Sequence, residues 1–157
     1  MRPEDRYDSL FQYYGWRSGV DWLLLKADAR QESNFNPDVV NPKSRAIGLC
    51  QFMPNTWKEW DDGTPGIQLL PGADMRLLDP RDPEDAIQAQ AAYFSWLLHR
   101  YAGDPQKALA AYNWGPGNLS KCIAAFGDDW KTRLPNETQN YLVRIETYYQ
   151  QYMKDQN

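Results

Sequence analysis

Residues 20–33 decide the fold class, and they read VDWLLLKADARQES. From Val20 to Ala27 the apolar residues recur at the i, i+3, i+4, i+7 spacing of a helix with one buried face. We expect this helix to run to about Ser33, and the Asn-Pro pair at 36–37 to end it. An amphipathic helix of this length needs other helices or a sheet to cover its apolar face.

Further helices are expected on both sides of this segment. Residues 7–14 predict a short first helix, and residues 54–60 predict another that carries Trp57 and Trp60. An aspartate followed by proline, at 82–83 and at 104–105, is typical of a capped helix start. Two more helices are expected after the turn at Gly115-Pro116-Gly117, one ending near Gly127 and one capped by Asn136. No segment alternates with period two, so we predict a mainly α protein.

Composition limits the class of protein. The 157 residues suit one domain, residues 1–157, and the net charge of −4 argues against nucleic-acid binding through a broad basic surface. The longest apolar run, residues 22–25, is far too short to span a membrane. Trp and Tyr are abundant, at 7 and 10 residues, and such rings can fill a core or stack on sugars.

The sequence predicts neither a metal nor a cofactor. It has one histidine, His99, two cysteines, and no CxxC or HExxH pattern. His99 is expected on the surface, off the apolar face of its helix. The polar first residues, 1–6, show no signal region, so we expect delivery by a phage or export by another route.

Glu32 is the candidate catalytic residue. It lies at the end of the 20–33 helix, where a side chain can face a cleft while apolar neighbours cover part of it. Partial burial raises the pKa of a carboxyl, which keeps it protonated as a general acid requires. The alternative is a solvated glutamate at a helix end. Ser33 lacks the GxSxG context of a hydrolase nucleophile.

Four segments together resemble the soluble lytic transglycosylase family. They are Glu32-Ser33, GLCQFMP at 48–54, AYNWGPG at 111–117 and PNETQNY at 135–141, and they occur in the family's order. The family comprises lysozyme-like enzymes of bacteria and phages that cleave peptidoglycan. The resemblance implies a lysozyme-like helical domain with a substrate cleft.

The resemblance also implies a reaction. Glu32 matches the family's single catalytic glutamate, which protonates the glycosidic oxygen between N-acetylmuramic acid and N-acetylglucosamine. It then acts as a base on the C6 hydroxyl of the muramic acid, which closes a 1,6-anhydro ring. The substrate's own N-acetyl group stands in for a second carboxylate, so no cofactor is implied.

Other site residues follow from the same motifs. The resemblance implies substrate binding by Ser33, Gln51, Tyr112, Asn113 and Tyr141, with Glu137 and Met53 in supporting roles. Each has a simpler alternative: Gln51 can bond the loop backbone, Asn113 can fix the turn, and Met53 can be a core residue. Glu137 is interpreted as bonding loop groups that hold Glu32, or as a carboxylate favoured by the helix dipole.

Two positions depart from the family pattern. Cys50 stands where methionine is usual, and Leu142 stands where valine is usual. The family fold would bring Cys50 near Cys122, which allows a disulfide. Two buried free thiols are the preferred prediction, because disulfide geometry is demanding.

Two other functions remain open from the sequence. A hydrolase similar to goose-type lysozyme would need a second carboxylate, for which Asp61, Asp62 and Asp74 are candidates. A glycan-binding module without activity would use the same cleft. Residues 61–82 form either a flap over the cleft or a surface loop. For any of these functions we expect a monomer whose partner is the peptidoglycan strand and which acts at the cell wall.

Overall fold

The computed structural model describes residues 1–54, 56–57 and 78–157. Within them the chain forms helices, and the only β structure is a pair of isolated bridges from Ile47 to Val40 and Phe52. The mainly α prediction is therefore confirmed. The elements in chain order are η1 Pro3–Asp5, α1 Asp8–Ser18, α2 Trp22–Ser33, α4 Pro83–Arg100, α5 Pro105–Trp114, α6 Pro116–Phe126, η3 Gly127–Arg133 and α7 Asn136–Asp155.

Most helix starts follow the predicted local chemistry. Asp82 accepts a hydrogen bond from the backbone N–H of Asp85 at 3.0 Å, and Asp104 accepts one from that of Gln106 at 3.0 Å. These bonds satisfy N–H groups that have no partner inside the helix. The start of α7 differs, because Pro135 precedes it and Asn136 is its first residue without a capping bond.

The predicted end of the second helix is confirmed, but two predicted turn residues differ. Helix α2 ends at Ser33, as expected, because Asn34 turns into the left-handed region, with φ 50°, before the Asn-Pro pair is reached. The turn after α5 is made by Gly115 alone, with φ 97°, and Gly117 already lies inside α6. The predictions for Trp60 and for the loop from 61 to 77 lie outside the described residues.

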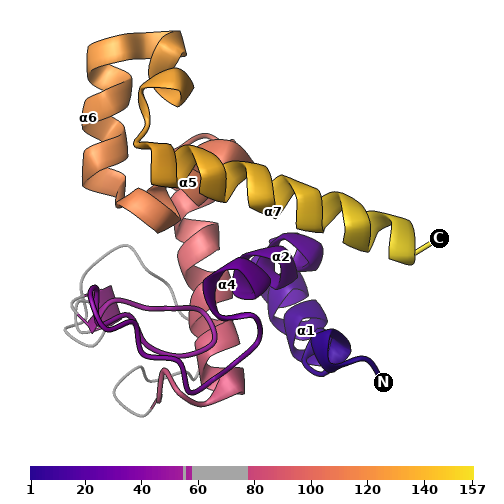
Figure 1. Ribbon diagram of the computed structural model, residues 1–157. Coiled ribbons are helices and arrows are strands. Elements are labelled where there is room, and N and C mark those ends of the chain that lie inside the picture. The colour runs from indigo at the N-terminus through magenta and orange to yellow at the C-terminus, as the bar shows by residue number, and fades with distance from the viewer. Residues whose placement is uncertain (55, 58–77) are drawn as a thin grey trace.

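The helices pack around α2. Helix α2 contacts α1, α4 and α7, while α5 contacts α4, α6 and α7. Figure 1 shows α7 crossing over α2, with α6 and η3 projecting beyond the start of α7. The two termini lie on the same side of the molecule, where Arg2 Nη2 is 3.2 Å from Asp155 Oδ2.

The core is one continuous apolar cluster to which every α-helix contributes. Val20, Leu23 and Ala27 of the predicted stripe are buried, as expected. The buried polar side chains among the described residues are Lys26, Asp28, Ser33, Gln90 and Thr138. Buried polar groups need hydrogen-bonding or ionic partners, so we expect specific polar contacts at these positions.

A loop from 34 to 53 lies between α2 and the start of α4. Gly48 has φ +80°, and a Cβ atom there would lie 2.0 Å from the carbonyl oxygen of Pro80. Only glycine fits this close approach in this backbone conformation. The loop is thereby held against the chain that leads into α4.

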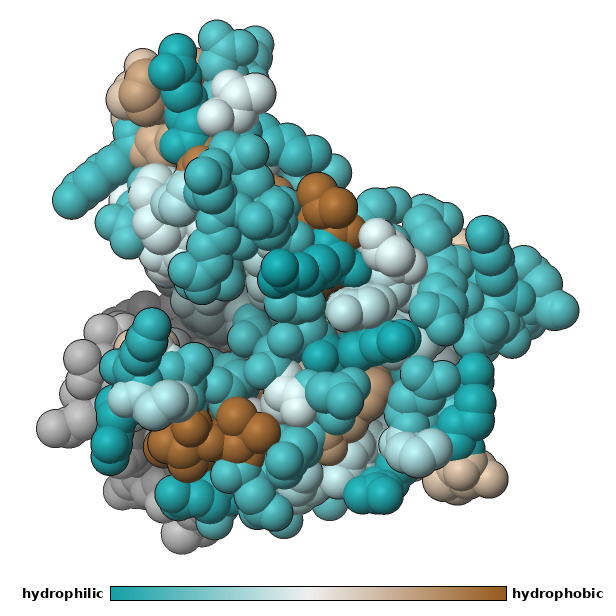
Figure 2. All heavy atoms as spheres, viewed as in Figure 1, coloured by the Kyte–Doolittle hydropathy of each residue, from teal (hydrophilic) through white to brown (hydrophobic). Residues whose placement is uncertain are grey.

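The surface is largely polar. Figure 2 shows hydrophilic side chains over most of the drawn face, with a hollow between the α6 end and the rest of the molecule. None of the helices in the described ranges is long and apolar enough to cross a membrane.

Candidate active site

Glu32 is the penultimate residue of α2, and its side chain is half-buried. Burial raises the pKa of its carboxyl well above the ordinary value, and the negative charges of Asp28 and Glu137 raise it further. A hydrogen bond from the Tyr141 hydroxyl opposes this effect. Glu32 therefore holds its proton to a higher pH than a solvated glutamate does.

Tyr141 joins two carboxyl groups. Its side chain is 2% exposed, and it comes from α7, which lies across α2. The hydroxyl donates a short hydrogen bond to Asp28 Oδ1 and also interacts with the carboxyl of Glu32. The predicted hydrogen-bonding role of Tyr141 is thus directed at these two acids.

Asp28 is a site residue that the sequence reasoning missed. It is fully buried one helical turn before Glu32, and Gln90 Nε2 of α4 donates to its Oδ2 at 2.8 Å. The same nitrogen donates to the carbonyl of Leu25 at 3.0 Å. Burial raises the pKa of Asp28 to about 7, although the bonds from Tyr141 and Gln90 oppose the rise. The signal in the sequence was an acidic residue close to the apolar stripe of a helix.

Tyr112 packs beside this pair of acids. Its ring stacks on Phe94, with centroids 4.7 Å apart and an interplanar angle of 6°. Its hydroxyl donates to the carbonyl of Cys50 at 2.7 Å. Burial raises the pKa of Tyr112 well above its usual value, and the charge of Asp28 adds to this. Tyr112 is therefore neutral, and it ties α5 to the loop.

Gln51 has a left-handed backbone, with φ 52°. Its Nε2 donates to the carbonyl of Val39 at 3.1 Å and to that of Gly48 at 2.9 Å. The alternative of a glutamine that bonds its own loop is confirmed for the amide nitrogen. These bonds fix the direction of the amide oxygen.

Ser33 fastens the end of α2 to the loop. Its buried hydroxyl lies 2.6 Å from the carbonyl oxygen of Leu49 and 3.2 Å from that of Ala29. Because a hydroxyl has one proton, both contacts share it. In the structure the hydroxyl of Ser33 is thus bonded to backbone carbonyls, and its expected contact with substrate stays a prediction.

The side chains of Asn113 and Met53 lie in different surroundings. Asn113 Oδ1 accepts a hydrogen bond from Thr138 Oγ1 at 2.9 Å, which links α5 to α7, a structural contact different from the predicted one with the turn. Met53 is 42% exposed, so the alternative that it is a core residue is wrong, and its supporting role stays a prediction. Its neighbour Phe52 is buried instead, because Phe52 pairs with Ile47 and points its ring to Trp57 and Tyr112.

Glu137 lies in the first turn of α7, and it is exposed. Within the described part of the chain its carboxylate makes no hydrogen bond, so the bonds to loop groups that we expected are not found there. Its charge reaches Glu32, whose pKa it raises. Its position also fits the alternative, a carboxylate favoured by a helix N-terminus.

Both cysteines are buried free thiols. The preferred prediction is confirmed, and the disulfide alternative is wrong. Burial raises the pKa of the Cys50 thiol well above its usual value, with the charges of Asp28 and Glu32 adding to the effect. Cys50 is therefore an inert apolar neighbour of the two acids.

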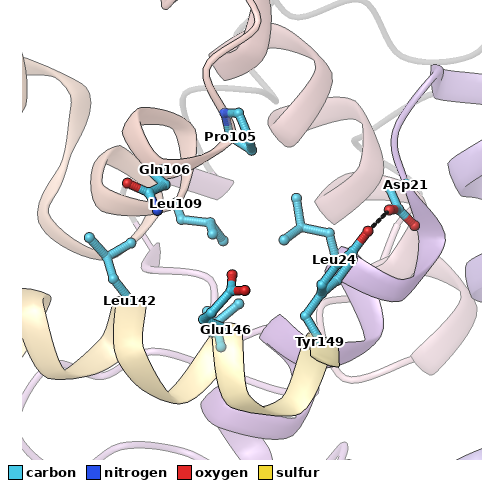
Figure 3. A pocket seen from close by; sticks show the side chains of 9 residues that line it. Asp21, Leu24, Pro105, Gln106, Leu109, Leu142, Glu146 and Tyr149 are labelled. Atoms are coloured by element: carbon cyan, nitrogen blue, oxygen red, sulfur yellow. Dashed lines mark hydrogen bonds between the residues drawn. The ribbon is translucent and has the colours of Figure 1, made fainter. Parts of the chain in front are cut away.

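A separate apolar recess lies between α2, α5 and α7 and measures about 280 Å³. Figure 3 shows Leu24, Leu109 and Leu142 pointing into it, with a dashed bond at one side. That bond runs from the Tyr149 hydroxyl to Asp21 Oδ2 at 2.6 Å. The lining contains none of the predicted site residues. No group of three His, Cys, Asp or Glu side chains suited to a metal occurs in the described ranges.

The arrangement around Glu32 can move one proton. Glu32 is half-buried and its pKa is raised, while Tyr141 connects it to the fully buried Asp28. A carboxyl with a raised pKa can act first as an acid and then, once ionised beside another negative charge, as a base.

Comparisons with known proteins identify the family of this chain. Residues 9–133 match the family model described as Transglycosylase SLT domain. Peptidoglycan transglycosylase gp16 of Escherichia phage T7 is 33% identical over 144 residues, which cover 91% of this chain and 10% of that protein. Membrane-bound lytic murein transglycosylase F of Pasteurella multocida is 31% identical over 148 residues, which cover 83% of this chain and 26% of that protein.

Solved structures have the same fold. An inactive mutant of the lytic transglycosylase Slt from Pseudomonas aeruginosa superposes with a TM-score of 0.76 at 28% identity, over 96% of this chain and 25% of that one. A 70-kDa soluble lytic transglycosylase in complex with bulgecin A gives 0.75 at 27% identity, over 96% and 25%. The lysozyme-like helical fold expected from the sequence is confirmed. The chain spans about a quarter or less of the length of these relatives.

Proposed function

The chain belongs to the Transglycosylase SLT domain family, and from that membership we propose that it cleaves peptidoglycan without water. The bond is the β-1,4 link between N-acetylmuramic acid and N-acetylglucosamine, and the product has a 1,6-anhydro end. The observation that carries the proposal is the half-buried Glu32, whose carboxyl keeps its proton because of burial and neighbouring negative charge.

Glu32 is the proposed catalytic residue in both steps. As an acid it gives its proton to the glycosidic oxygen, so that the leaving sugar departs as an alcohol. The N-acetyl oxygen of the muramic acid stabilises C1 from within the substrate, where its effective concentration is high. Glu32 then takes the proton of the C6 hydroxyl as that oxygen bonds to C1. The enzyme regains its proton, and no water is consumed.

We assign substrate contacts to groups near Glu32 that still have a free polar atom or an accessible ring face. Gln51 offers its amide oxygen, because its nitrogen is bonded to the loop. The half-buried ring of Tyr112 offers an apolar face and an edge to a sugar. Ser33 and Asn113 act by holding α2, the loop, α5 and α7 in position.

The setting of this activity is part of the proposal. We assign residues 1–157 to one catalytic domain that works as a monomer on glycan strands, and place its action at the cell wall, outside the cytoplasmic membrane. Relatives named as a phage peptidoglycan transglycosylase and a bacterial murein transglycosylase support this setting. Delivery by a phage or export from a bacterium are both compatible with it.

The test is mass spectrometry of fragments released from purified peptidoglycan. The wild-type protein should release muropeptides about 18 Da lighter than hydrolysis products, since no water is added. Glu32→Gln should release none, and the matched control Glu146→Gln, which removes an exposed carboxylate of α7 that has no site role, should keep the products. Reducing-end products from the wild type would assign a hydrolase. No release from the wild type would favour a glycan-binding module.

A further inference from the structure

Asp28 is a buried carboxyl that the reaction, as described above, does not use. Its side chain is inaccessible to solvent, and the groups that reach it are the Tyr141 hydroxyl and Gln90 Nε2. Both are neutral donors, and no cation contacts this carboxyl in the described part of the chain. A buried carboxylate without a counter-ion is unfavourable, so a fold keeps it only where something offsets it.

The hydrogen bonds around Tyr141 connect Asp28 to Glu32. Tyr141 has a single hydroxyl proton, and both carboxyls interact with that hydroxyl. A bond from Tyr141 to Glu32 lowers the pKa of Glu32, so a proton that points to Asp28 instead is not available to stabilise an ionised Glu32. The bond from Tyr141 to Asp28 is this arrangement.

We propose that Asp28 is a positioning residue which, acting through Tyr141, keeps Glu32 protonated before bond cleavage and makes it a stronger base afterwards. The proposal rests on the function proposed above. Of the two neighbouring carboxyls, Glu32 holds the single proton and faces the substrate. Asp28 carries the negative charge and cannot reach the substrate.

The other groups facing Glu32 do not replace Asp28. Tyr112 of α5 and Cys50 of the loop both interact with Asp28 and Glu32, but burial keeps each of them neutral. Glu137 of α7 is charged and exposed, so water and salt screen it. Among the described groups that act on Glu32, Asp28 is thus the one unscreened negative charge.

The proton balance closes over one reaction cycle. Glu32 starts protonated, and Tyr141 donates to ionised Asp28. Loss of the Glu32 proton to the glycosidic oxygen leaves two negative charges joined by one hydroxyl proton. Their repulsion raises the proton affinity of Glu32, which then takes the proton of the C6 hydroxyl. The starting state returns, and at a pH above the pKa of Asp28, about 7, Asp28 stays ionised throughout.

The substitution Asp28→Asn tests this directly. Asparagine keeps an oxygen that can accept from Tyr141 but removes the charge. We expect the alkaline limb of the pH–kcat profile to move down by about one pH unit, with KM little changed, because Glu32 ionises more easily. The matched control is Asp8→Asn, a partly buried carboxylate of α1 bonded to Lys26, which should lower stability and leave the limb in place.

A measurement without substrate separates this proposal from the proposed function. Carboxyl ¹³C NMR titration should give a Glu32 midpoint about one unit lower in Asp28→Asn than in wild type. It should also show wild-type Glu32 and Asp28 titrating together, each reporting both steps. Independent one-step titrations in the wild type, or an unmoved Glu32 midpoint in the folded variant, would overturn the proposal. Missing anhydro products would overturn only the proposed function.

Discussion

Helix α2 carries ionisable side chains on two opposite faces, and the two faces are built in opposite ways. Lys26 and Arg30 form the cation face, and Asp28 and Glu32 form the acid face. Each pair is spaced by four residues, so its members share a face, while the offset of two residues turns the pairs about 200° apart. Lys26 Nζ lies 2.8 Å from Asp5 Oδ1 and 2.8 Å from Asp8 Oδ1. The acid face has no such counter-ion among the described residues.

The same residue type responds differently on the two faces. The bond from Arg2, followed by that from Lys26, lowers the pKa of Asp5 to about 2. Burial without a cation raises the pKa of Asp28 to about 7. The cation face of the helix therefore holds the N-terminal segment in place. The acid face binds a proton to a higher pH, and its buried carboxyl lowers the free energy of unfolding.

The largest effect on stability is expected from breaking the cation face. In Lys26→Met the carboxylates of Asp5 and Asp8 lose their shared partner, and breaking a buried pair removes about 3–5 kcal/mol of unfolding free energy. Urea unfolding followed by circular dichroism measures this loss. Turnover per folded molecule should not change, and a change in the pH profile would contradict the separation of the two faces.

A smaller effect is expected where α2 meets the loop. Ser33→Ala leaves the buried carbonyl of Leu49 without its donor, which lowers the unfolding free energy by about 1–3 kcal/mol. Because the loop also carries Gln51, we expect KM to rise more than kcat falls. Steady-state kinetics on soluble glycan fragments check this, and an unchanged KM with a lower kcat would argue for a direct role of Ser33 in the chemistry.

The two faces should give stability opposite dependences on pH. The folded pKa of Asp28, about 7, lies above its unfolded value of 3.8, so the folded state binds more protons and its stability falls as the pH rises between these values. The folded pKa of Asp5, about 2, lies below 3.8, so its contribution is lost as the pH falls from about 4 to about 2.

Melting temperatures across this range measure both effects. In Asp28→Asn the melting temperature should fall less steeply from pH 4 to pH 7. Its loss below pH 4, which we call the acid limb, should be the same as in the wild type. An identical decline in wild type and variant would mean that Asp28 does not titrate in this interval. Asp5→Asn, the matched change on the cation face, should weaken the acid limb only.

The smallest effect is expected in the recess of Figure 3. Tyr149→Phe removes one partly exposed hydrogen bond to Asp21, whose Oδ1 also caps α2 through the N–H of Leu23 at 3.0 Å. We expect a loss of about 0.5–1.5 kcal/mol in unfolding free energy. Activity should stay at the wild-type level in a muropeptide-release assay, and a loss of activity would make this recess part of the substrate site.

Local signals in the sequence predicted most of the helices. Caps such as Asp82 and Asp104 act within three residues, so their chemistry can be recognised without knowing the fold. The resemblance identified Glu32, Tyr112 and Tyr141, which the structure brings together. It also identified Ser33 and Asn113, although the structure uses their side chains to tie elements together.

Long-range contacts explain what the sequence did not reveal. Tyr141 meets Asp28 across 113 positions, and Gln90 meets it across 62, so neither bond has a local pattern. The exposure of Met53 depends on which way the loop turns after Phe52, and that is set by the bridge to Ile47. An acid beside an apolar stripe can be noticed in a sequence, but its partners cannot.

The most direct test of the two-face account compares Glu32→Gln with Lys26→Met in the same two assays, anhydro-muropeptide release and urea unfolding. The account predicts a crossed result. Glu32→Gln loses at least about 10³-fold in turnover and keeps or gains stability, because a buried acid is removed. Lys26→Met loses stability and keeps its turnover per folded molecule. Wild-type turnover in Glu32→Gln, or parallel losses of both properties in both variants, would contradict the account.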